Sequence, residues 1–266
     1  MSNEDILLYE KKGHIVIITI NRPERMNTFT PELYDRFNEA WIRYRDDNDA
    51  RVAIVTAAGD RAFSTGMDLK DQAERVAKDP SFDIVKLKPG VVDGSEGTPR
   101  GNKVYKPVIA AVNGIATAGG FQLLMQCDIR IAVEGAKIGI SEAKVGRGSP
   151  WAVPLLFQMP TPIAAEILLT ASLMPAKRLY DVGWINQVVP ADQLMSAAMK
   201  MAELIQDNAP LSLMAAKMML NKIPDELLKE GLEMAKKIYE PVYASEDAQE
   251  GPRSFAEKRK PVWKGK

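Results

Sequence analysis

The sequence is poor in the residues that build metal, disulfide and nucleophile chemistry. Its 266 residues include one cysteine and one histidine. A single cysteine excludes an internal disulfide and a cysteine-based zinc site. Cys127 lies in the apolar stretch LLMQCDIRIA, which indicates a buried structural thiol rather than a nucleophile. His14, the only histidine that a Ser-His-Asp triad could use, opens the apolar run HIVIITI and indicates a strand start.

The sequence also lacks an excess of charge of either sign and any long apolar run. Lys plus Arg and Asp plus Glu balance at 35 each, so no overall field favours nucleic acid or an anionic membrane. A basic cluster occurs only in the C-terminal stretch EKRKPVWKGK. No apolar run reaches the roughly 18 residues of a membrane span, and MSNEDILLYE lacks the pattern of a signal peptide. We therefore expect a cytoplasmic protein with no nucleic-acid, membrane or metal partner.

Apolar strand patterns alternate with helical patterns in the first two thirds of the chain. Strands are expected over the β-branched runs 14–20, 51–59, 108–112 and 128–133. Thr30 and Pro31 form a helix start, with Thr at the cap and Pro just inside it. This alternation predicts an α/β fold.

The remainder of the chain is expected to differ in character. Residues 78–102 are rich in Pro, Gly and Asp, which predicts a long irregular loop of the kind that often forms a binding lid. From residue 162 onward the patterns are helical, with separate helices expected over 210–223 and 225–244. The many methionines of this region recur at helical spacing, which indicates packing in a core or a subunit interface.

The stretch VNGIATAGG contains two adjacent glycines, Gly119 and Gly120, at the start of an amphipathic segment. It imitates the glycine fingerprint of dinucleotide-binding proteins, and Glu134 follows Gly114 at the spacing of the ribose-binding acid. Its mid-chain position and the lack of further strand-helix units behind it make this the weaker interpretation.

A second glycine stretch favours another interpretation. AFSTGMDLK follows a predicted strand, and Gly66 again precedes a helix start, with Asp68 in the first turn. Two helix starts with unpaired backbone N–H groups can converge on one oxygen and stabilise its negative charge, as an oxyanion hole does. The pair of stretches therefore indicates chemistry on a thioester or another acyl group.

Five stretches together resemble the crotonase, or enoyl-CoA hydratase/isomerase, superfamily across nearly the whole chain. They are ITINRPERMNTFTPEL, AFSTGMDLK, KPVIAAVNGIATAGGFQLLMQCDIRIA, IGISEAKVG and EGPRSFAEKRKPVWKG. The resemblance implies an α/β spiral core of ββα units over residues 1–200 and a helical trimerisation region over 201–266. It also implies a coenzyme A thioester as substrate, with no permanently bound cofactor, and a homotrimer or a dimer of trimers.

The resemblance assigns roles to residues of both glycine stretches. The two oxyanion N–H donors fall on Met67 and Gly119. Gly66 and Gly120 shape the approach of the thioester oxygen. Asp68 is assigned to the substrate pocket.

Gln122 departs from the pattern of the family's hydratases. The resemblance implies that those enzymes carry two glutamates, one at the position of Gln122 and one at the position of Glu142. A carboxylate pair can activate water and protonate the α-carbon, whereas a glutamine amide takes no proton near neutral pH. Glu142, in IGISEAKVG, is left as the one proton-transfer group. Hydration, double-bond isomerisation and the hydratase-lyase reaction all stay open, as does a non-catalytic acyl-CoA-binding role.

Further residues are assigned to substrate and coenzyme A by the same resemblance. The segment GRGSPWAVP replaces the glycine-rich loop of common hydratases, so Pro150 and Trp151 are expected to reshape the acyl pocket, with plain packing of Trp151 as the alternative. The coenzyme A contacts that the resemblance implies are Arg25, Met26, Lys70, Phe255 and Lys258. The last two would reach a neighbouring subunit's adenosine phosphate, with a solvated helix end as the alternative.

Overall fold

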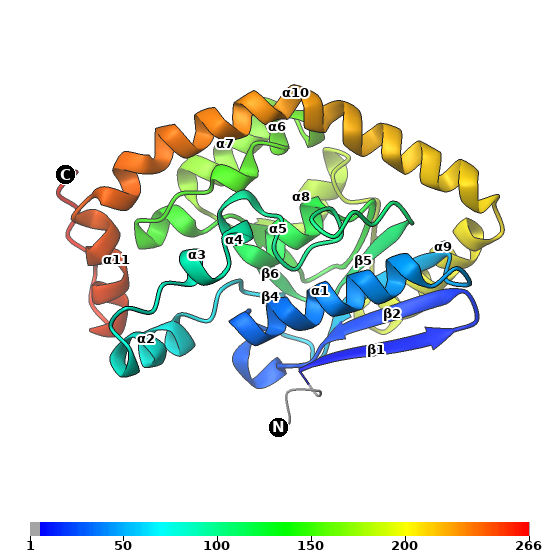
Figure 1. Ribbon diagram of the computed structural model, residues 1–266, viewed down its shortest axis with the longest axis horizontal. Coiled ribbons are helices and arrows are strands. Elements are labelled where there is room, and N and C mark those ends of the chain that lie inside the picture. The colour runs from blue at the N-terminus through cyan, green and yellow to red at the C-terminus, as the bar shows by residue number, and fades with distance from the viewer. Residues whose placement is uncertain (1–5, 266) are drawn as a thin grey trace.

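The computed structural model describes residues 6–265, which form a mixed α/β molecule with two sheets (Figure 1). The strands of the larger sheet, in spatial order, are β1 (Leu7–Lys12), β2 (Ile15–Ile20), β3 (Val52–Ala57), β5 (Val108–Val112), β7 (Ile129–Val133) and β10 (Gln187–Val189). Those of the smaller sheet are β4 (Ala62–Ser64), β6 (Ile115–Thr117), β8 (Lys137–Gly139) and β9 (Met174–Pro175). The expectation about a signal peptide concerns the first residues of the chain, and residues 1–5 lie outside the part that the structure describes.

From β3 to β8, successive strands alternate between the two sheets. β3, β5 and β7 belong to the larger sheet, and each is followed by a strand of the smaller one, β4, β6 or β8. Pairing is parallel from β2 through β10 in the larger sheet and from β4 through β8 in the smaller. A helix follows each strand pair, so the ββα spiral expected from the sequence is confirmed.

The helices follow the strand pairs and then dominate the second half of the chain. Those of the first half are η1 (Pro23–Arg25), α1 (Pro31–Asp46), α2 (Leu69–Lys78), α3 (Ile84–Leu87), α4 (Gly90–Asp93), α5 (Gly119–Met125) and η2 (Glu142–Val145). Those of the second half are η3 (Pro150–Ala152), α6 (Leu155–Gln158), α7 (Thr161–Thr170), α8 (Ala176–Asp181), η4 (Ala191–Gln193), α9 (Leu194–Gln206), α10 (Pro210–Ala244) and α11 (Asp247–Ala256).

The core forms where the sequence patterns place it. β3 and β5 are buried at every residue, as their unbroken apolar runs require when helices cover both faces of a parallel sheet. α1 begins where Thr30 accepts a hydrogen bond from the Leu33 N–H, and it buries Phe37 and Trp41, whose rings stack 6.0 Å apart. α9 packs on β3, β5 and β7.

Two expectations about the local structure are wrong. Residues 78–102 are not uniformly irregular, because the single-turn helices α3 and α4 interrupt the segment; Asp83 caps the first of them through its carboxylate. Helix α10 runs through Pro224 without a break. A proline removes one helical hydrogen bond and disfavours the helix, but in a helix of 35 residues the turns on either side keep their own hydrogen bonds.

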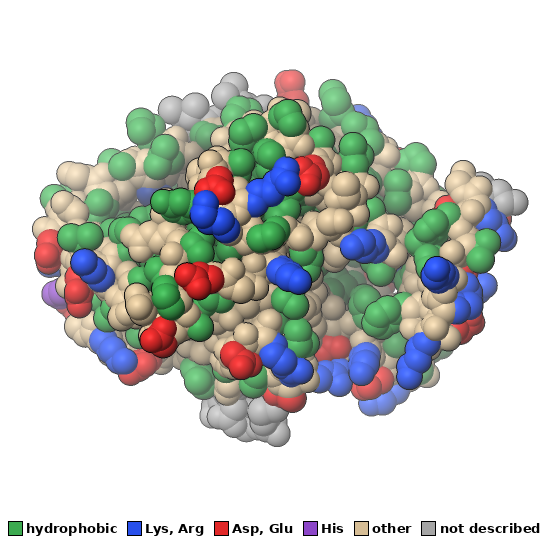
Figure 2. Space-filling model, turned by 180° about the vertical axis from the view of Figure 1, so that it is seen from behind, with side chains coloured by type: hydrophobic (Ala, Val, Ile, Leu, Met, Phe, Trp, Pro, Cys, Tyr) green, Lys and Arg blue, Asp and Glu red, His purple; other side chains and the backbone are tan. Residues whose placement is uncertain are grey.

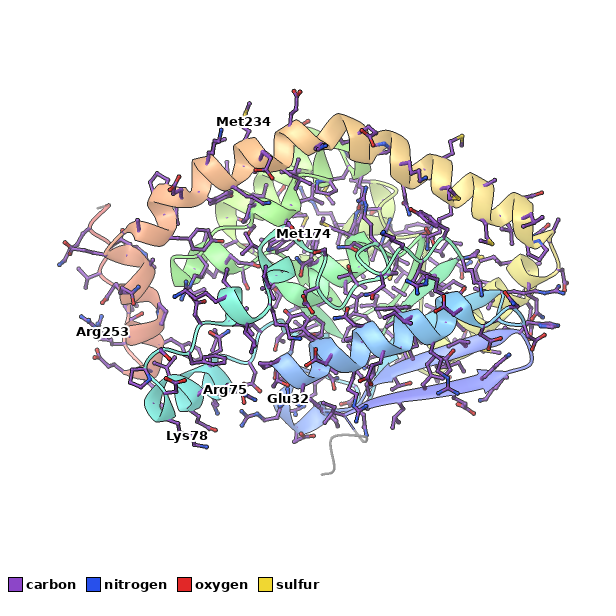
Figure 3. All side chains as sticks on the ribbon, in the orientation of Figure 1. Glu32, Arg75, Lys78, Met174, Met234 and Arg253 are labelled. Atoms are coloured by element: carbon purple, nitrogen blue, oxygen red, sulfur yellow. The ribbon has the colours of Figure 1, made fainter. Side chains whose placement is uncertain are left out.

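The helical second half forms an arch over the spiral. α10 extends along one side of the molecule, and α11 turns back at its end (Figure 1). Met234 on α10 is 61% exposed and lies on the outer side of the arch (Figure 3). Figure 2 shows the face that lies behind the view of Figure 1, where basic and acidic side chains are interspersed with apolar side chains between them. In the part of the chain that the structure covers, no helix is both long and apolar enough to cross a membrane.

Candidate active site

The smaller sheet brings three distant segments to one edge. β4, β6 and β8 run parallel, so residues 65–68, 118–122 and 140–142 leave the sheet at the same ends of neighbouring strands. Thr117, at the end of β6, donates a hydrogen bond from its hydroxyl to the Ser141 hydroxyl at 3.0 Å. The residue after Ser141 is Glu142, so the expected proton-transfer group lies beside the glycine stretch.

The two glycine stretches touch through their backbones. Gly66 has a φ of +80°, and a Cβ at this position would lie 2.5 Å from the Ala118 Cβ and 2.8 Å from the Gly119 nitrogen. No residue with a side chain fits there, because both the conformation and the space require glycine. The N–H of Gly119 therefore lies directly against the segment that carries Met67.

The backbone N–H of Met67 points away from its neighbouring segment. The Phe29 N–H donates to the Gly66 carbonyl at 2.7 Å, and the Asp68 N–H donates to the Phe29 carbonyl at 2.9 Å. In a parallel bridge of this kind the intervening residue, Met67, directs its own N–H and carbonyl to the other side. This leaves the Met67 N–H available on the side opposite Phe29.

Gly119 supplies the second N–H from a strained helix start. Ala118 precedes α5 with a φ of 52° and a ψ of −124°, a conformation that costs an ordinary residue of order 1–3 kcal/mol. The first helical hydrogen bond of α5 runs from the Gln122 N–H to the Ala118 carbonyl, so the Gly119 N–H has no partner within the helix. Gly120 allows close packing, because a Cβ there would collide with the Ser64 carbonyl and keep α5 away from β4.

Glu142 is the first residue of η2, directly behind β8. Its Oε2 is fully buried and has no hydrogen-bond partner among the described residues. Burial raises the pKa of this carboxyl to about 7, and the backbone N–H groups of Glu142 and Ser141 only partly offset the effect. A carboxyl with a pKa near neutrality can both take and return a proton at physiological pH.

Gln122 is 4% exposed on α5, and its Nε2 is a buried donor without a partner among the described residues. The amide packs on Gly94 at the end of α4, where a Cβ would lie 2.7 Å from the Gln122 Nε2. Trp151 packs on the same glycine, and its ring lies 6.3 Å from that of Phe121. Trp151 is buried and borders the cavity near Gln122, and Pro150 is buried next to it.

One cavity lies near α4 and another lies against α9. The one beside Gln122 has a volume of about 280 Å³ and is bordered by Gly94, Gln126 and Trp151. A larger one, of about 580 Å³, lies between the larger sheet and α9, and none of the expected site residues borders it. Of the expected site residues, Trp151 borders the smaller cavity.

Asp68 anchors the loop of residues 22–28. Its buried carboxylate accepts hydrogen bonds from Arg22 at 3.2 Å, Arg25 at 3.1 Å and the Thr28 hydroxyl at 2.9 Å, and it caps α2 through the Asp71 N–H. Burial alone would raise the pKa of Asp68, but the backbone N–H of Asp71 and the Arg25 guanidinium outweigh it and lower the pKa. The carboxylate thus fixes the loop rather than facing the cavity beside Gln122.

The residues expected to contact coenzyme A fall into two groups. Arg25 and Met26 lie on the loop that Asp68 fixes, and Lys70 is exposed in the first turn of α2. An ion pair of 2.6 Å between Arg75 on α2 and Glu32 on α1 holds that helix in place (Figure 3). Phe255 and Lys258 form the second group; they are exposed near the end of α11 and are far from the first group in the sequence.

Helix α11 packs against the turn that carries Glu142. Gly251 lies so close to the Val145 carbonyl that a Cβ would collide with it, and Gly146 likewise lies against the Asp247 carbonyl, at 2.5 Å from an added Cβ. At the end of α10, the Tyr243 hydroxyl donates to the Gly148 carbonyl at 3.0 Å. The C-terminal helices of the same chain therefore support η2 and the loop behind it.

Sequence reasoning missed three residues of this site. Tyr34 is buried on α1, and burial first, then the charges of Glu96 and Glu142, raises its pKa. Its spacing with Phe37 and Trp41 signals only a core position. Gly94 carries no local signal, whereas Gln126, a second glutamine four residues after Gln122, could have been found from helical periodicity.

Comparisons with known proteins place this geometry in a family. A sequence model of the enoyl-CoA hydratase/isomerase family matches residues 10–266. The chain is 39% identical to enoyl-CoA hydratase EchA19 of Mycobacterium tuberculosis, over 96% of this chain and 94% of the relative. It is 37% identical to a carnitinyl-CoA dehydratase of Salmonella paratyphi B, over 96% of this chain and 97% of the relative.

Solved structures agree with the sequence comparisons. A carnitinyl-CoA hydratase from Mycobacterium avium superimposes with a TM-score of 0.85 at 32% identity, covering 98% of this chain and 99% of that one. The family and the fold expected from the five motifs are thereby confirmed, and the dinucleotide interpretation of the glycine stretch falls. The chain is an enzyme of the enoyl-CoA hydratase/isomerase family, with the crotonase fold.

Proposed function

We propose that this enzyme moves protons beside the thioester of a bound acyl-CoA, with Glu142 as the proton-transfer group. The buried, unpartnered Oε2 of Glu142 beside the Gly66–Gly119 contact is the observation that carries the proposal. The names of its relatives, an enoyl-CoA hydratase and a carnitinyl-CoA dehydratase, support an acyl-CoA substrate. Such substrates share an acidic C–H next to a carbonyl.

The proposed step needs one base and two hydrogen-bond donors. A Glu142 oxygen takes the proton from C2, and the electrons of the C–H bond move onto the thioester oxygen. The N–H groups of Met67 and Gly119 stabilise the resulting enolate oxygen, an effect of the size that oxyanion donors typically supply, about 10²–10³ in rate each. Return of the proton from Glu142 completes the exchange.

The amide of Gln122 decides which overall reaction this step serves. Hydration requires a proton taken from water and a proton given to C2, which a second carboxylate would ease. Gln122 can only hold a water or a substrate oxygen through its Nε2 donor. We keep hydratase-type chemistry as the first assignment, with double-bond isomerisation or the hydratase-lyase reaction as the alternative that the single carboxyl favours.

The residues proposed to contact coenzyme A and the proposed oligomeric state both rest on membership of the same family. The half-buried Arg25 and Met26 and the exposed Lys70 are proposed to contact coenzyme A, as are Phe255 on α11 and Lys258 just beyond it. Residues 201–266 are proposed to form a trimer, or a dimer of trimers. The exposed apolar side chains of α10 support an interface there; they are Leu211, Met219, Leu220, Met234 and Ile238.

Exchange of C2 hydrogens with solvent deuterium tests the proposal directly. A saturated acyl-CoA incubated with the enzyme in deuterium oxide should gain deuterium at C2, as followed by mass spectrometry, although it cannot be hydrated or isomerised. Exchange should rise with pH through about 7, since the ionised form of Glu142 is the base. Binding of acyl-CoA without any exchange would leave a non-catalytic binding protein instead.

A further inference from the structure

Gln126 is the residue at the C-terminal cap of α5, one helical turn beyond Gln122, and it has no part in the proton transfer proposed above. Its Nε2 donates to the Gly94 carbonyl, which fixes the orientation of the amide. Its Oε1 is then left as a buried acceptor with no partner among the described residues. A buried acceptor without a donor is costly, and a ligand that supplies one would relieve that cost.

The two amides share one contact point. The Gln122 Nε2 packs on Gly94, and Gly94 accepts from Gln126 through its carbonyl. Gly94 has a φ of +84°, and an added Cβ would also lie 3.3 Å from Trp151, so this position accommodates only glycine. The α4 turn thereby contacts both amides, and of the two it is Gln126 that borders the cavity, together with Gly94.

The cavity of about 280 Å³ beside these amides has an apolar wall and a charged rim. Met125, Trp151, Pro154 and Leu232 form the wall. Charged side chains border the rest: Asp93, Arg100, Lys229, Glu233 and Lys236. The acidic pair is outnumbered by the basic residues, so the lining has no excess of negative charge that would select a cationic chain.

We propose that this cavity binds the distal part of an acyl chain that carries a hydroxyl group, which donates its hydrogen bond to the Oε1 of Gln126. The inference rests on the proposed acyl-CoA function. Gln126 follows Gly119 by seven residues, about 10 Å along a helix axis, so the hydroxyl lies several carbons beyond the thioester. The Gln122 Nε2 stays available for an oxygen nearer the thioester.

Other acyl chains fit the cavity less well for a chemical reason. An alkyl chain has no donor and leaves the Gln126 Oε1 unpaired. A quaternary ammonium group also has no N–H to donate. A hydroxyl supplies the donor and costs little in size against the apolar wall.

Matched ligand pairs test the inference. Calorimetry would compare ω-hydroxyhexanoyl-, ω-hydroxyheptanoyl- and ω-hydroxyoctanoyl-CoA, each with the alkyl acyl-CoA of equal heavy-atom number. We expect about 10-fold tighter binding of the hydroxylated chain for at least one length. Gln126→Met, which keeps the length and helix propensity of the side chain, should reduce that ratio to about 1. The control Gln249→Met, at an exposed position of α11, should leave the ratio unchanged.

The outcomes separate this inference from the proposed function. Equal binding of both chains by the wild type at every length would overturn it, as would a preference for a chain ending in trimethylammonium or a ratio that survives in Gln126→Met. If that variant does not fold, the wild-type ratio decides alone. Failure of every acyl-CoA to bind or to exchange at C2 would instead refute the proposed function.

Discussion

Glu142→Gln should make the protein more stable at alkaline pH while it abolishes catalysis. The carboxyl has an ordinary pKa of 4.5 in the unfolded chain and a pKa of about 7 in the folded protein, because burial penalises its charged form. The folded state therefore binds the proton more tightly, and stability is lost as pH rises from 4.5 through 7. A neutral amide has nearly the same shape and carries no such penalty.

The magnitude follows from the pKa difference. One pKa unit corresponds to 1.36 kcal/mol, so the shift from 4.5 to about 7 amounts to about 3 kcal/mol of unfolding free energy at pH 8. For a chain of this size, that gain raises Tm by roughly 10 °C. Below pH 4.5 the carboxyl is protonated in both states, and the gain should vanish.

Urea denaturation at a fixed protein concentration, repeated across a pH series, measures this difference. The exposed Glu203 on α9 provides the control, since Glu203→Gln should change the unfolding free energy by no more than about 0.5 kcal/mol at any pH. Equal stability of Glu142→Gln and wild type at pH 8 would refute the reasoning. So would a gain that grows below pH 4.5.

Three further changes bear on the chemistry and on the backbone contact. Glu142→Gln should slow C2 deuterium exchange by about 10²–10⁴ while the Kd for a saturated acyl-CoA stays nearly constant; weakened binding with unchanged exchange per bound ligand would contradict its role. Gly119→Pro removes one N–H at a position where proline starts helices well, and it should cost about 10²–10³ in exchange rate. Gly119→Ala, which keeps the N–H but brings a Cβ to 3.0 Å from Phe29, separates the steric effect, and an active folded proline variant would exclude this donor. Gln122→Glu should raise crotonyl-CoA hydration, most strongly above neutral pH where the new carboxylate is ionised; vigorous wild-type hydration with no gain would show that no base is missing there.

Local signals in the sequence determined the elements that surround the site. Thr30 and Pro31 predict the start of α1 because a hydroxyl cap and a fixed proline φ act within one turn, and the structure has that start. The apolar runs predict β2, β3 and β5 because a strand buried on both faces needs an unbroken apolar sequence. The motifs around Gly66, Gly119 and Glu142 identified the family, which the comparisons confirm.

Patterns that depend on distant partners escaped the sequence. The edge strand β1 reads LLYEKK, which has no clear strand period, and it forms because β2 offers an antiparallel edge. Helix α10 passes Pro224 because a proline removes one hydrogen bond and the turns on either side keep theirs, whereas sequence reasoning treats it as a stop.

Only the tertiary structure decided what the site residues face. The sequence places Gln122 on a helix and Glu142 on a turn, but it missed Gln126. The unpartnered atoms of all three residues result from burial by α4, η3 and the C-terminal helices. The raised pKa of Glu142 has the same origin, since desolvation depends on every atom packed around the carboxyl and not on its neighbours in the chain. The sequence alone determined which groups this protein has for its chemistry, and the packing of remote segments determined their protonation and their surroundings.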